Sequence, residues 1–198
     1  MAQDMANFSL GAAEVERRLA RFLRIDAAAT ARIVDAYRAT LPGATPSQIM
    51  AAVTTDYTYR RNTTMEARLQ SATASAPVHA YVFDWQTPVR GGVLGSPHTS
   101  EVPFVFGTAP AAAALVGTGP DIAPLTRMMV ATWSAFARTG DPANPDLPDW
   151  PRYEATGRST MLLSRGSAVA ADPGGKRREA LAGLPPYEYS MPVNYQRA

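Results

Sequence analysis

The chain has 198 residues, of which 46% are hydrophobic and 18% are charged; this balance is typical of one folded domain with a sizeable core and excludes general disorder. The formal charge of +2 is small and the basic residues are scattered, so no nucleic-acid-binding surface is expected. Cysteine is absent, which excludes disulfides and thiol chemistry, and no apolar run approaches the roughly 20 residues that a membrane span needs.

The first 75 residues are predicted to form a helical layer with short breaks. Apolar residues at helical spacing predict a first helix over residues 12–23. Asp26 is the expected N-cap of a second helix that reaches residue 41, and Pro46 is expected to open a third helix that runs toward residue 57. A fourth helix is expected over about residues 63–74.

The sequence pattern changes after residue 75. Residues 78–83 are β-prone with apolar side chains on both faces, which predicts an interior strand covered by helices. A Gly- and Pro-rich loop over residues 86–97 follows. Residues 121–139 carry apolar side chains at three- and four-residue steps, which predicts an amphipathic helix with Trp133, Phe136 and its methionines in the core, capped by Gly140.

The C-terminal part is predicted to contain a short strand over residues 159–164, a helix over about residues 175–181 and an irregular, proline-rich tail. The basic run Lys176-Arg177-Arg178 is expected to be a solvated helix start. We therefore expect a single partial domain in three regions: a helical layer (1–75), a strand, loop, long helix and last strand (76–165), and a terminal helix with its tail (166–198).

The strongest functional signal is the segment around His98. This histidine follows a Ser-Pro turn, lies three residues before Glu101 and precedes the Phe-Val-Phe-Gly run of residues 104–107. A turn followed by a buried anchor presents a reactive imidazole at a surface while it fixes the backbone. The pattern resembles the histidine loop of type-B carboxylesterases, whose usual form is His-Gly-x-Glu-x-x-Phe-Val-Phe-Gly. Thr99 replaces the usual glycine.

Three further motifs resemble the same family in the same order. They are the strand Tyr81-Val82-Phe83-Asp84-Trp85, the helix end Thr139-Gly140-Asp141-Pro142 and the segment Trp150-Pro151-x-Tyr153. Together the motifs cover about residues 78–163. The resemblance implies the C-terminal part of an α/β-hydrolase fold, a helix-rich α/β structure with few strands and an incomplete sheet. It also implies a chemistry that needs no metal or organic cofactor.

The nucleophile of such an enzyme is not found in this sequence. Chain order in α/β-hydrolases is serine, acid, histidine, and no Gly-x-Ser-x-Gly elbow occurs. The nearest segment, around Ser9, lacks the first glycine and precedes a predicted helix without a strand before it. The chain therefore resembles the C-terminal portion of a carboxylesterase, whose partner would be the N-terminal half of the hydrolase domain.

The resemblance also implies roles for three residues. His98 would be the general base, and the alternative is a loop histidine that only hydrogen-bonds its neighbours. Asp4 falls where the family carries its acid in an Asn-x-x-Glu segment, and the alternative is a polar residue near a terminus. Glu101 would steady the loop through backbone hydrogen bonds or be a solvated surface charge. His79, inside the expected strand, is interpreted as structural.

The sequence thus favours a serine ester hydrolase that acts on a small-molecule ester by acyl transfer, with this chain inactive by itself. The alternative is a non-catalytic, cholinesterase-like interaction domain, favoured by the absent serine. A stand-alone helical binding domain does not explain the ordered motifs. The N-terminus lacks a signal-peptide pattern, which slightly favours the cytoplasm, although a signal peptide could lie in the N-terminal half.

Overall fold

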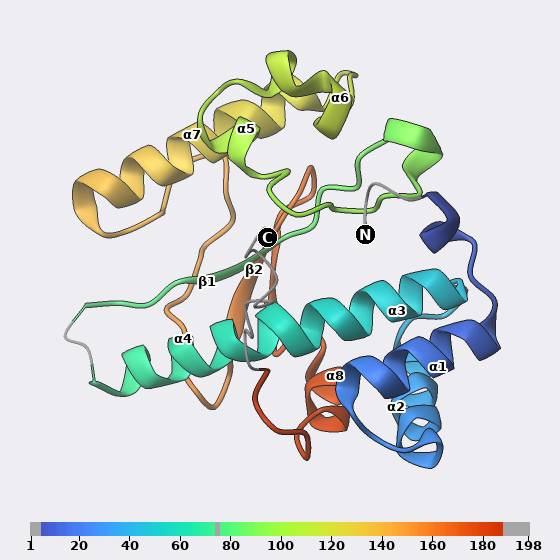
Figure 1. Ribbon diagram of the computed structural model, residues 1–198. Coiled ribbons are helices and arrows are strands. Elements are labelled where there is room, and N and C mark those ends of the chain that lie inside the picture. The colour runs from blue at the N-terminus through green and yellow to red at the C-terminus, as the bar shows by residue number, and fades with distance from the viewer. Residues whose placement is uncertain (1–4, 74–75, 188–198) are drawn as a thin grey trace, which may run out of the picture. The chain divides into compact units, whose positions relative to one another are not determined.

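The computed structural model describes residues 5–73 and 76–187. The chain forms two compact units (Figure 1). Unit 1 consists of Met1–Phe8 and Thr64–Pro173, and unit 2 consists of Ser9–Thr63 and Gly174–Ala198. The expected division of a single domain into three successive regions stays a prediction.

Unit 2 is helical. Its elements are α1 (Ala12–Leu23), α2 (Ala27–Thr40), α3 (Pro46–Thr55), the π-helix η2 (Asp56–Arg60) and α8 (Gly175–Ala180), and α4 (Arg61–Thr73) begins here and continues into unit 1. The expected N-cap is confirmed, because the Asp26 carboxylate accepts a hydrogen bond from the Ala29 amide at 2.7 Å. Thr45 and Gln48 form a capping box at the start of α3, just before Pro46.

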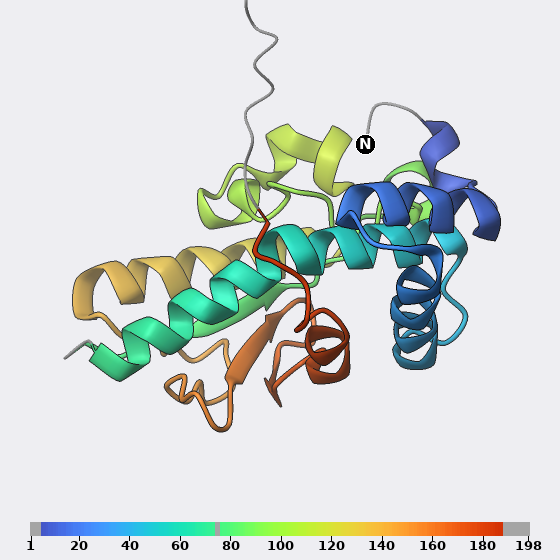
Figure 2. The same cartoon turned by 60° about the horizontal axis from the view of Figure 1, so that its bottom comes forward.

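The core of unit 2 is formed by apolar side chains of α1, α2 and α3, together with Tyr57 of η2 and Leu181, which directly follows α8. α8, near the C-terminal end of the described chain, packs against α2 (Figure 1, Figure 2). Fully buried members of this core are Val15, Leu19, Val34, Tyr37, Ile49, Val53 and Leu181. Burial of such side chains contributes about 1.5–3 kcal/mol each, so this packing accounts for much of the stability of the unit.

A buried carboxylate joins the helices of unit 2. Asp56, whose side chain is 8% exposed, accepts a hydrogen bond from the Tyr37 hydroxyl at 3.0 Å. It also pairs with Arg60 at 3.3 Å and with Arg177 at 3.2 Å. Burial and the charge of Asp56 raise the pKa of Tyr37 above its ordinary value. The expectation that Arg177 is solvated is wrong, because a buried carboxylate needs a counter-charge and Arg177 supplies it from α8.

Replacement of this carboxylate is expected to destabilise the chain. Asp56→Asn keeps the shape but leaves two guanidinium groups without their anion, which should lower the free energy of unfolding by about 2 kcal/mol. The measurement is the urea midpoint by pulse proteolysis at low protein concentration. The matched control is Asp35→Asn, whose exposed ion pair with Arg38 should change the free energy by less than about 0.5 kcal/mol. Equal losses in the two variants would contradict this role of Asp56.

Unit 1 contains a three-stranded sheet. Its strands β1 (Ala80–Phe83), β2 (Ser159–Leu163) and β3 (Ala168–Ala171) lie in the order β1-β2-β3. β1 and β2 are parallel, with Phe83 opposite Leu163, and β2 and β3 are antiparallel. The two expected strands are confirmed, but β1 is not interior in the described sheet. It pairs with β2 on one side only. Tyr81, which projects from one face of the strand, is 40% exposed.

Helices cover part of this sheet. Unit 1 also contains η1 (Met5–Phe8), η3 (Val89–Gly92), α5 (Val102–Val105), η4 (Ala109–Ala112), α6 (Ala113–Val116) and α7 (Ile122–Thr139). Buried side chains of α7, among them Leu125 and Met129, pack in one cluster with Met161 and Leu163 of β2. No helix in the described ranges is long and apolar enough to cross a membrane.

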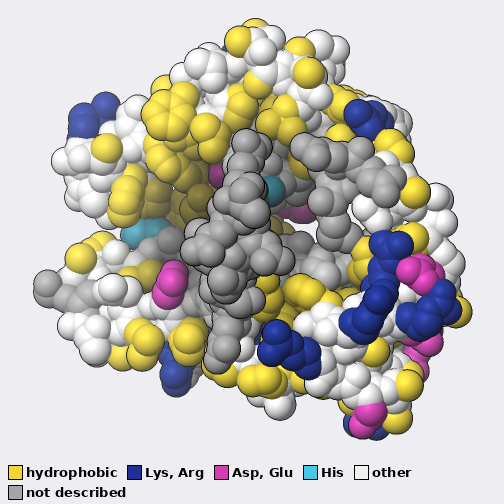
Figure 3. All heavy atoms as spheres, in the orientation of Figure 1, with side chains coloured by type: hydrophobic (Ala, Val, Ile, Leu, Met, Phe, Trp, Pro, Cys, Tyr) yellow, Lys and Arg dark blue, Asp and Glu magenta, His cyan; other side chains and the backbone are white. Residues whose placement is uncertain are grey.

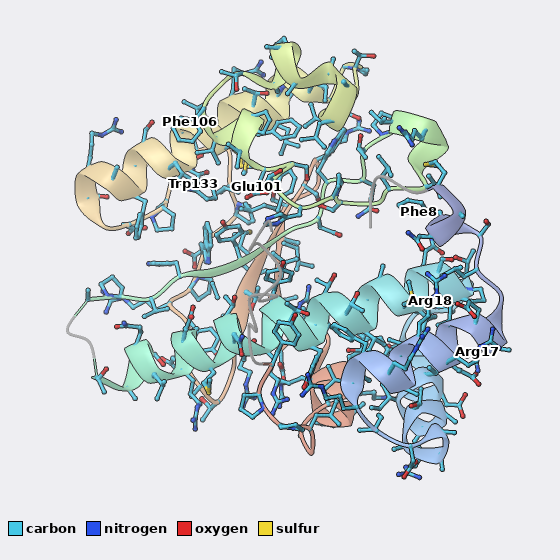
Figure 4. All side chains as sticks on the ribbon, in the orientation of Figure 1. Phe8, Arg17, Arg18, Glu101, Phe106 and Trp133 are labelled. Carbon is cyan, nitrogen blue, oxygen red and sulfur yellow. The ribbon has the colours of Figure 1, made fainter. Side chains whose placement is uncertain are left out.

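The C-terminal end of α7 departs from the expected burial. Gly140 caps the helix with φ of 75°, as predicted from its position. Phe136, however, is 47% exposed, and the Trp133 ring packs edge-on against Tyr81 with centroids 5.2 Å apart. The expectation that Phe136 lies in the core is wrong. This end of α7 lies beside β1, the edge strand of the described sheet, and no described element covers Phe136 there. Figure 4 shows Trp133 projecting from α7 on this side.

Candidate active site

The loop after β1 turns back to the end of the strand. The Asp84 amide donates to the Leu163 carbonyl at 2.8 Å, which continues the β1–β2 pairing by one residue. The Thr87 amide donates to the Gly95 carbonyl at 2.9 Å and closes the loop. The Ser96 hydroxyl donates to the Phe83 carbonyl at 3.2 Å. The residues just before His98 are therefore fastened to the last residue of β1.

A second set of contacts holds this loop against the end of α6. The Trp85 indole donates to the Val116 carbonyl at 3.1 Å, and the hydroxyl of the fully buried Thr87 donates to the Leu115 carbonyl at 2.8 Å. Gly117 has φ of 83°, and a Cβ there would lie 2.5 Å from Cγ of Pro88. Only glycine permits this approach, so Gly117, directly after α6, is part of the loop's support.

The anchor after the turn is Phe104. It is fully buried in α5, and its ring centroid lies 5.6 Å from that of Phe83 and 6.0 Å from that of Trp85. Phe104 thus packs against Phe83 and Trp85, the residues that lead from β1 into the loop, although it lies after the loop in the chain. Phe106 is 74% exposed and does not belong to this anchor (Figure 4). The Phe-Val-Phe-Gly run therefore consists of the last two residues of α5 and the turn that follows, with one buried ring.

His98 lies in the turn between these two supports, and its side chain is exposed. The turn is closed by the Ser100 amide, which donates to the Pro97 carbonyl at 3.1 Å, and by the Thr99 hydroxyl, which donates to the His98 carbonyl at 2.5 Å. The backbone around His98 is thus held by the turn while the residue itself is exposed. Such an arrangement can present a proton acceptor to another group.

Thr99 adopts a conformation that favours glycine. Its φ is 69°, in the left-handed region, where a β-branched residue is uncommon. In the histidine loop of type-B carboxylesterases, which this segment resembles, the residue at this position is usually glycine. The strain is local and lies directly beside the backbone of His98.

Thr99→Gly is expected to stabilise the chain by about 0.5–1 kcal/mol. Relief of the left-handed strain of about 1–2 kcal/mol exceeds the entropy that glycine adds to the unfolded chain. The urea midpoint measures the change. Thr108→Gly is the control, because Thr108 is also exposed but has φ of −105°, and the substitution should be destabilising. A loss of stability in both variants would show that the Thr99 backbone is not strained.

Two residues follow Thr99 in the turn. Ser100 is fully buried, and its hydroxyl has no hydrogen-bond partner among the described residues. Glu101 is half-buried, and its carbonyl accepts from the amides of Phe104 and Val105, both at 3.0 Å, where α5 begins. Burial of Tyr81 raises the pKa of its hydroxyl, and the negative charge of Glu101 raises that pKa further. The predicted supporting role of Glu101 stays a prediction.

The other sequence candidates are placed as follows. Asp4 lies outside the described residues, so the structure does not position the predicted acid. Ser9 follows η1 and precedes α1, and no strand leads into it in the described part of the chain. His79 is half-buried with its ring edge-on to Trp150 at 5.8 Å, and burial lowers its pKa. Nowhere in ranges 5–73 and 76–187 do three His, Asp or Glu side chains gather as a metal-binding group.

Comparison with known sequences identifies one family. A sequence model of the carboxylesterase family matches residues 4–178. Phenmedipham hydrolase of Pseudarthrobacter oxydans is 37% identical over 101 residues, which are 48% of this chain and 20% of that protein. Para-nitrobenzyl esterase of Bacillus subtilis is 30% identical over 108 residues, which are 54% of this chain and 22% of that protein. The match therefore spans about a fifth of these relatives.

Solved structures agree with this result over more of the chain. The carboxylesterase EST55 of Geobacillus stearothermophilus, determined at pH 6.2, superimposes with a TM-score of 0.73 and 31% sequence identity. The superposition covers 90% of this chain and 36% of that enzyme. A thermophilic para-nitrobenzyl esterase gives a TM-score of 0.63 at 26% identity, with 87% of this chain and 34% of that enzyme covered.

Proposed function

Because the chain belongs to the carboxylesterase family, as the C-terminal portion of an α/β-hydrolase fold, we propose that it supplies the catalytic histidine of a serine esterase. His98 would accept the proton of a serine hydroxyl as the serine oxygen bonds to the ester carbonyl carbon. It would then donate that proton to the leaving alcohol, and afterwards accept a proton from the water that hydrolyses the acyl-enzyme. The observation that carries the proposal is the exposed His98 in a turn whose flanking segments are held by β1 and Phe104.

The serine would come from the N-terminal half of the hydrolase domain. The sequence contains no Gly-x-Ser-x-Gly elbow, and in this fold the serine precedes the histidine in the chain. The same half would supply the backbone donors that stabilise the oxyanion. Two relatives are named for phenmedipham and para-nitrobenzyl substrates, so small aromatic esters are suitable first substrates.

The open edge of β1 supports docking of that half. β1 has the sequence Ala-Tyr-Val-Phe, without charge or proline, and pairs only with β2 among the described residues. An unprotected edge of this kind is a template for another strand. Tyr81 and Phe136 are both exposed nearby, and Figure 3 shows hydrophobic side chains gathered over the α5–α7 part of unit 1. We assign this edge to a strand of the N-terminal half.

Asp4 remains the proposed acid. An aspartate there would accept a hydrogen bond from the imidazole, fix its tautomer and stabilise the imidazolium. Glu101 is proposed to hold the turn at the start of α5. The second candidate function, a non-catalytic interaction domain, is favoured by the absent serine and by the same apolar edge. It predicts binding that does not depend on His98.

The proposal predicts that the chain alone is poorly soluble, because one edge of β1 is open. It also predicts no measurable turnover of a p-nitrophenyl ester, because the chain lacks the nucleophile. A fusion protein tests this prediction. It joins the N-terminal part of EST55, up to the start of the superimposed region, to residues 1–198. The fusion protein is expected to release p-nitrophenolate from p-nitrophenyl butyrate, and the interaction-domain reading predicts that it does not. Turnover by the chain alone that His98→Ala abolishes would contradict the proposed division of the site.

A further inference from the structure

A cavity in unit 2 carries chemistry that ester hydrolysis by His98 does not use. It lies between the C-terminal end of α1 and residues 185–187, and its volume is about 390 Å³. Small-molecule sites usually have volumes of about 300–1,000 Å³. Every residue that lines this cavity belongs to unit 2, whereas His98 belongs to unit 1.

One wall of the cavity is aromatic. Phe22 and Tyr57 meet edge to face with ring centroids 5.8 Å apart. Tyr187 completes a triangle, with centroids 5.7 Å from Tyr57 and 5.8 Å from Phe22. Each ring is thereby fixed by the other two. The wall presents ring edges and faces that suit a further aromatic ring.

The charged side chains at the cavity are both hydrogen-bond donors. Arg21 and Arg24 line it and are exposed, and neither forms an ion pair or side-chain hydrogen bond with any described residue. The Tyr57 hydroxyl is already engaged, because it donates to the Pro185 carbonyl at 3.0 Å. Arg61 donates to that same carbonyl at 3.0 Å. No acidic side chain is among the lining residues, so the unused capacity consists of two guanidinium groups.

We propose that this cavity binds an aromatic carboxylate of about the size of benzoate. A carboxylate matches the planar donor pattern of a guanidinium group, and Arg21 and Arg24 supply two such groups. The ring of the ligand would pack against Phe22, Tyr57 and Tyr187. Figure 3 shows Asp and Glu side chains beside the Lys and Arg side chains over α1, and Arg17 and Arg18 of this helix pair with Glu14. The proposal therefore depends on Arg21 and Arg24 alone. The proposal stands independently of the esterase activity.

Two other cavities fit a ligand less well. A cavity of about 310 Å³ beside α7 has charges of both signs, and its Arg165 already pairs with Asp121 at 3.0 Å. A cavity lined by His79, Tyr81 and Trp133 has only about 120 Å³ and lies at the open edge of β1.

The test is saturation-transfer difference NMR on the full 198-residue chain with sodium benzoate, since this method needs little soluble protein. We expect a dissociation constant on the order of 1 mM, as a ligand of this size allows. Benzyl alcohol, which lacks the charge, and acetate, which lacks the ring, should bind at least about tenfold more weakly. Inorganic phosphate, which has no observable proton, is the fourth probe and is added as a competitor of benzoate. Displacement of benzoate by an equal concentration of phosphate would replace the aromatic carboxylate with a simple anion and overturn the proposal.

Variants separate the proposed site from general charge attraction. Arg21→Gln with Arg24→Gln should weaken benzoate binding about tenfold, and Phe22→Leu should weaken benzoate more than acetate. Arg32→Gln is the control, because Arg32 is an exposed arginine of α2 in the same unit and does not line the cavity. Circular dichroism checks that each variant folds. Absence of benzoate binding, or equal loss in the Arg32 variant, would overturn the proposal.

Discussion

His98→Ala is expected to remove almost all ester hydrolysis from the fusion protein of EST55 and residues 1–198. Without the imidazole, the serine hydroxyl loses its proton acceptor and the leaving alcohol loses its proton donor. Loss of the histidine of a comparable serine hydrolase costs on the order of 10⁶-fold in kcat. The initial rate of p-nitrophenolate release at saturating ester measures the effect. His98 is exposed, so its replacement should leave the fold intact.

The matched control is the second histidine of the chain. His79→Gln keeps a polar planar side chain beside Trp150 and should retain most of the kcat. Thr99→Gly should also retain it, because only backbone strain changes at that position. A kcat that falls equally in the His98 and His79 variants would indicate a general loss of structure and contradict the assignment of His98.

Phe104→Ala is expected to give the largest loss of stability in the loop region. Phe104 is fully buried between Phe83 and Trp85, and removal of a buried phenylalanine ring costs about 3–5 kcal/mol. Phe106→Ala, two residues later in the same motif, should change the free energy of unfolding by less than about 0.5 kcal/mol, because Phe106 is 74% exposed. The structure therefore separates two residues that the sequence motif treats alike.

Urea midpoints of the two variants by pulse proteolysis provide this comparison. In the fusion protein, Phe104→Ala should also lower kcat, because the turn that holds His98 loses its anchor. In a fusion protein whose N-terminal half covers Phe106, Phe106→Ala should lower the free energy of unfolding more than it does in the chain alone. Equal stability of the two variants in the chain alone would show that Phe104 does not fix the loop.

Local signals predicted α1 and α2 well, whereas the expected break between the third and fourth helices is wrong, because α3, η2 and α4 follow one another without a gap. The apolar spacing of residues 12–23 and the cap at Asp26 correspond to α1 and α2, because capping and amphipathic packing act within a few residues of the chain. Gly140 ends α7 for the same reason. The ordered motifs predicted the fold class, and the comparison with EST55 confirms the C-terminal part of an α/β-hydrolase fold with an incomplete sheet.

Features that depend on distant partners were not predicted. β3 has the sequence Ala-Val-Ala-Ala, which carries little β-propensity, and it forms only because β2 offers an edge. Arg177 reads as part of a solvated basic run, but its partner Asp56 lies more than a hundred residues away in the chain. The apolar sequence of β1 predicted an interior strand, whereas the described sheet leaves one edge open.

The candidate site shows the same division between local and distant information. The motif identified His98 and the loop, and it marked Thr99 as a departure from the usual glycine. The sequence could not show that Phe104 alone is buried, or that Gly117 must approach Pro88 so closely. These facts arise from contacts between α5, α6 and the loop, which no local pattern encodes.

The rate at which the serine of the fusion protein reacts with phenylmethylsulfonyl fluoride tests the central claim most directly. This reaction reports on activation of the hydroxyl by the imidazole and does not require turnover. We predict that His98→Ala lowers this rate by several orders of magnitude, because the serine hydroxyl loses its proton acceptor, and that His79→Gln leaves the rate nearly unchanged. A rate that is unchanged in His98→Ala would contradict the claim that His98 is the general base.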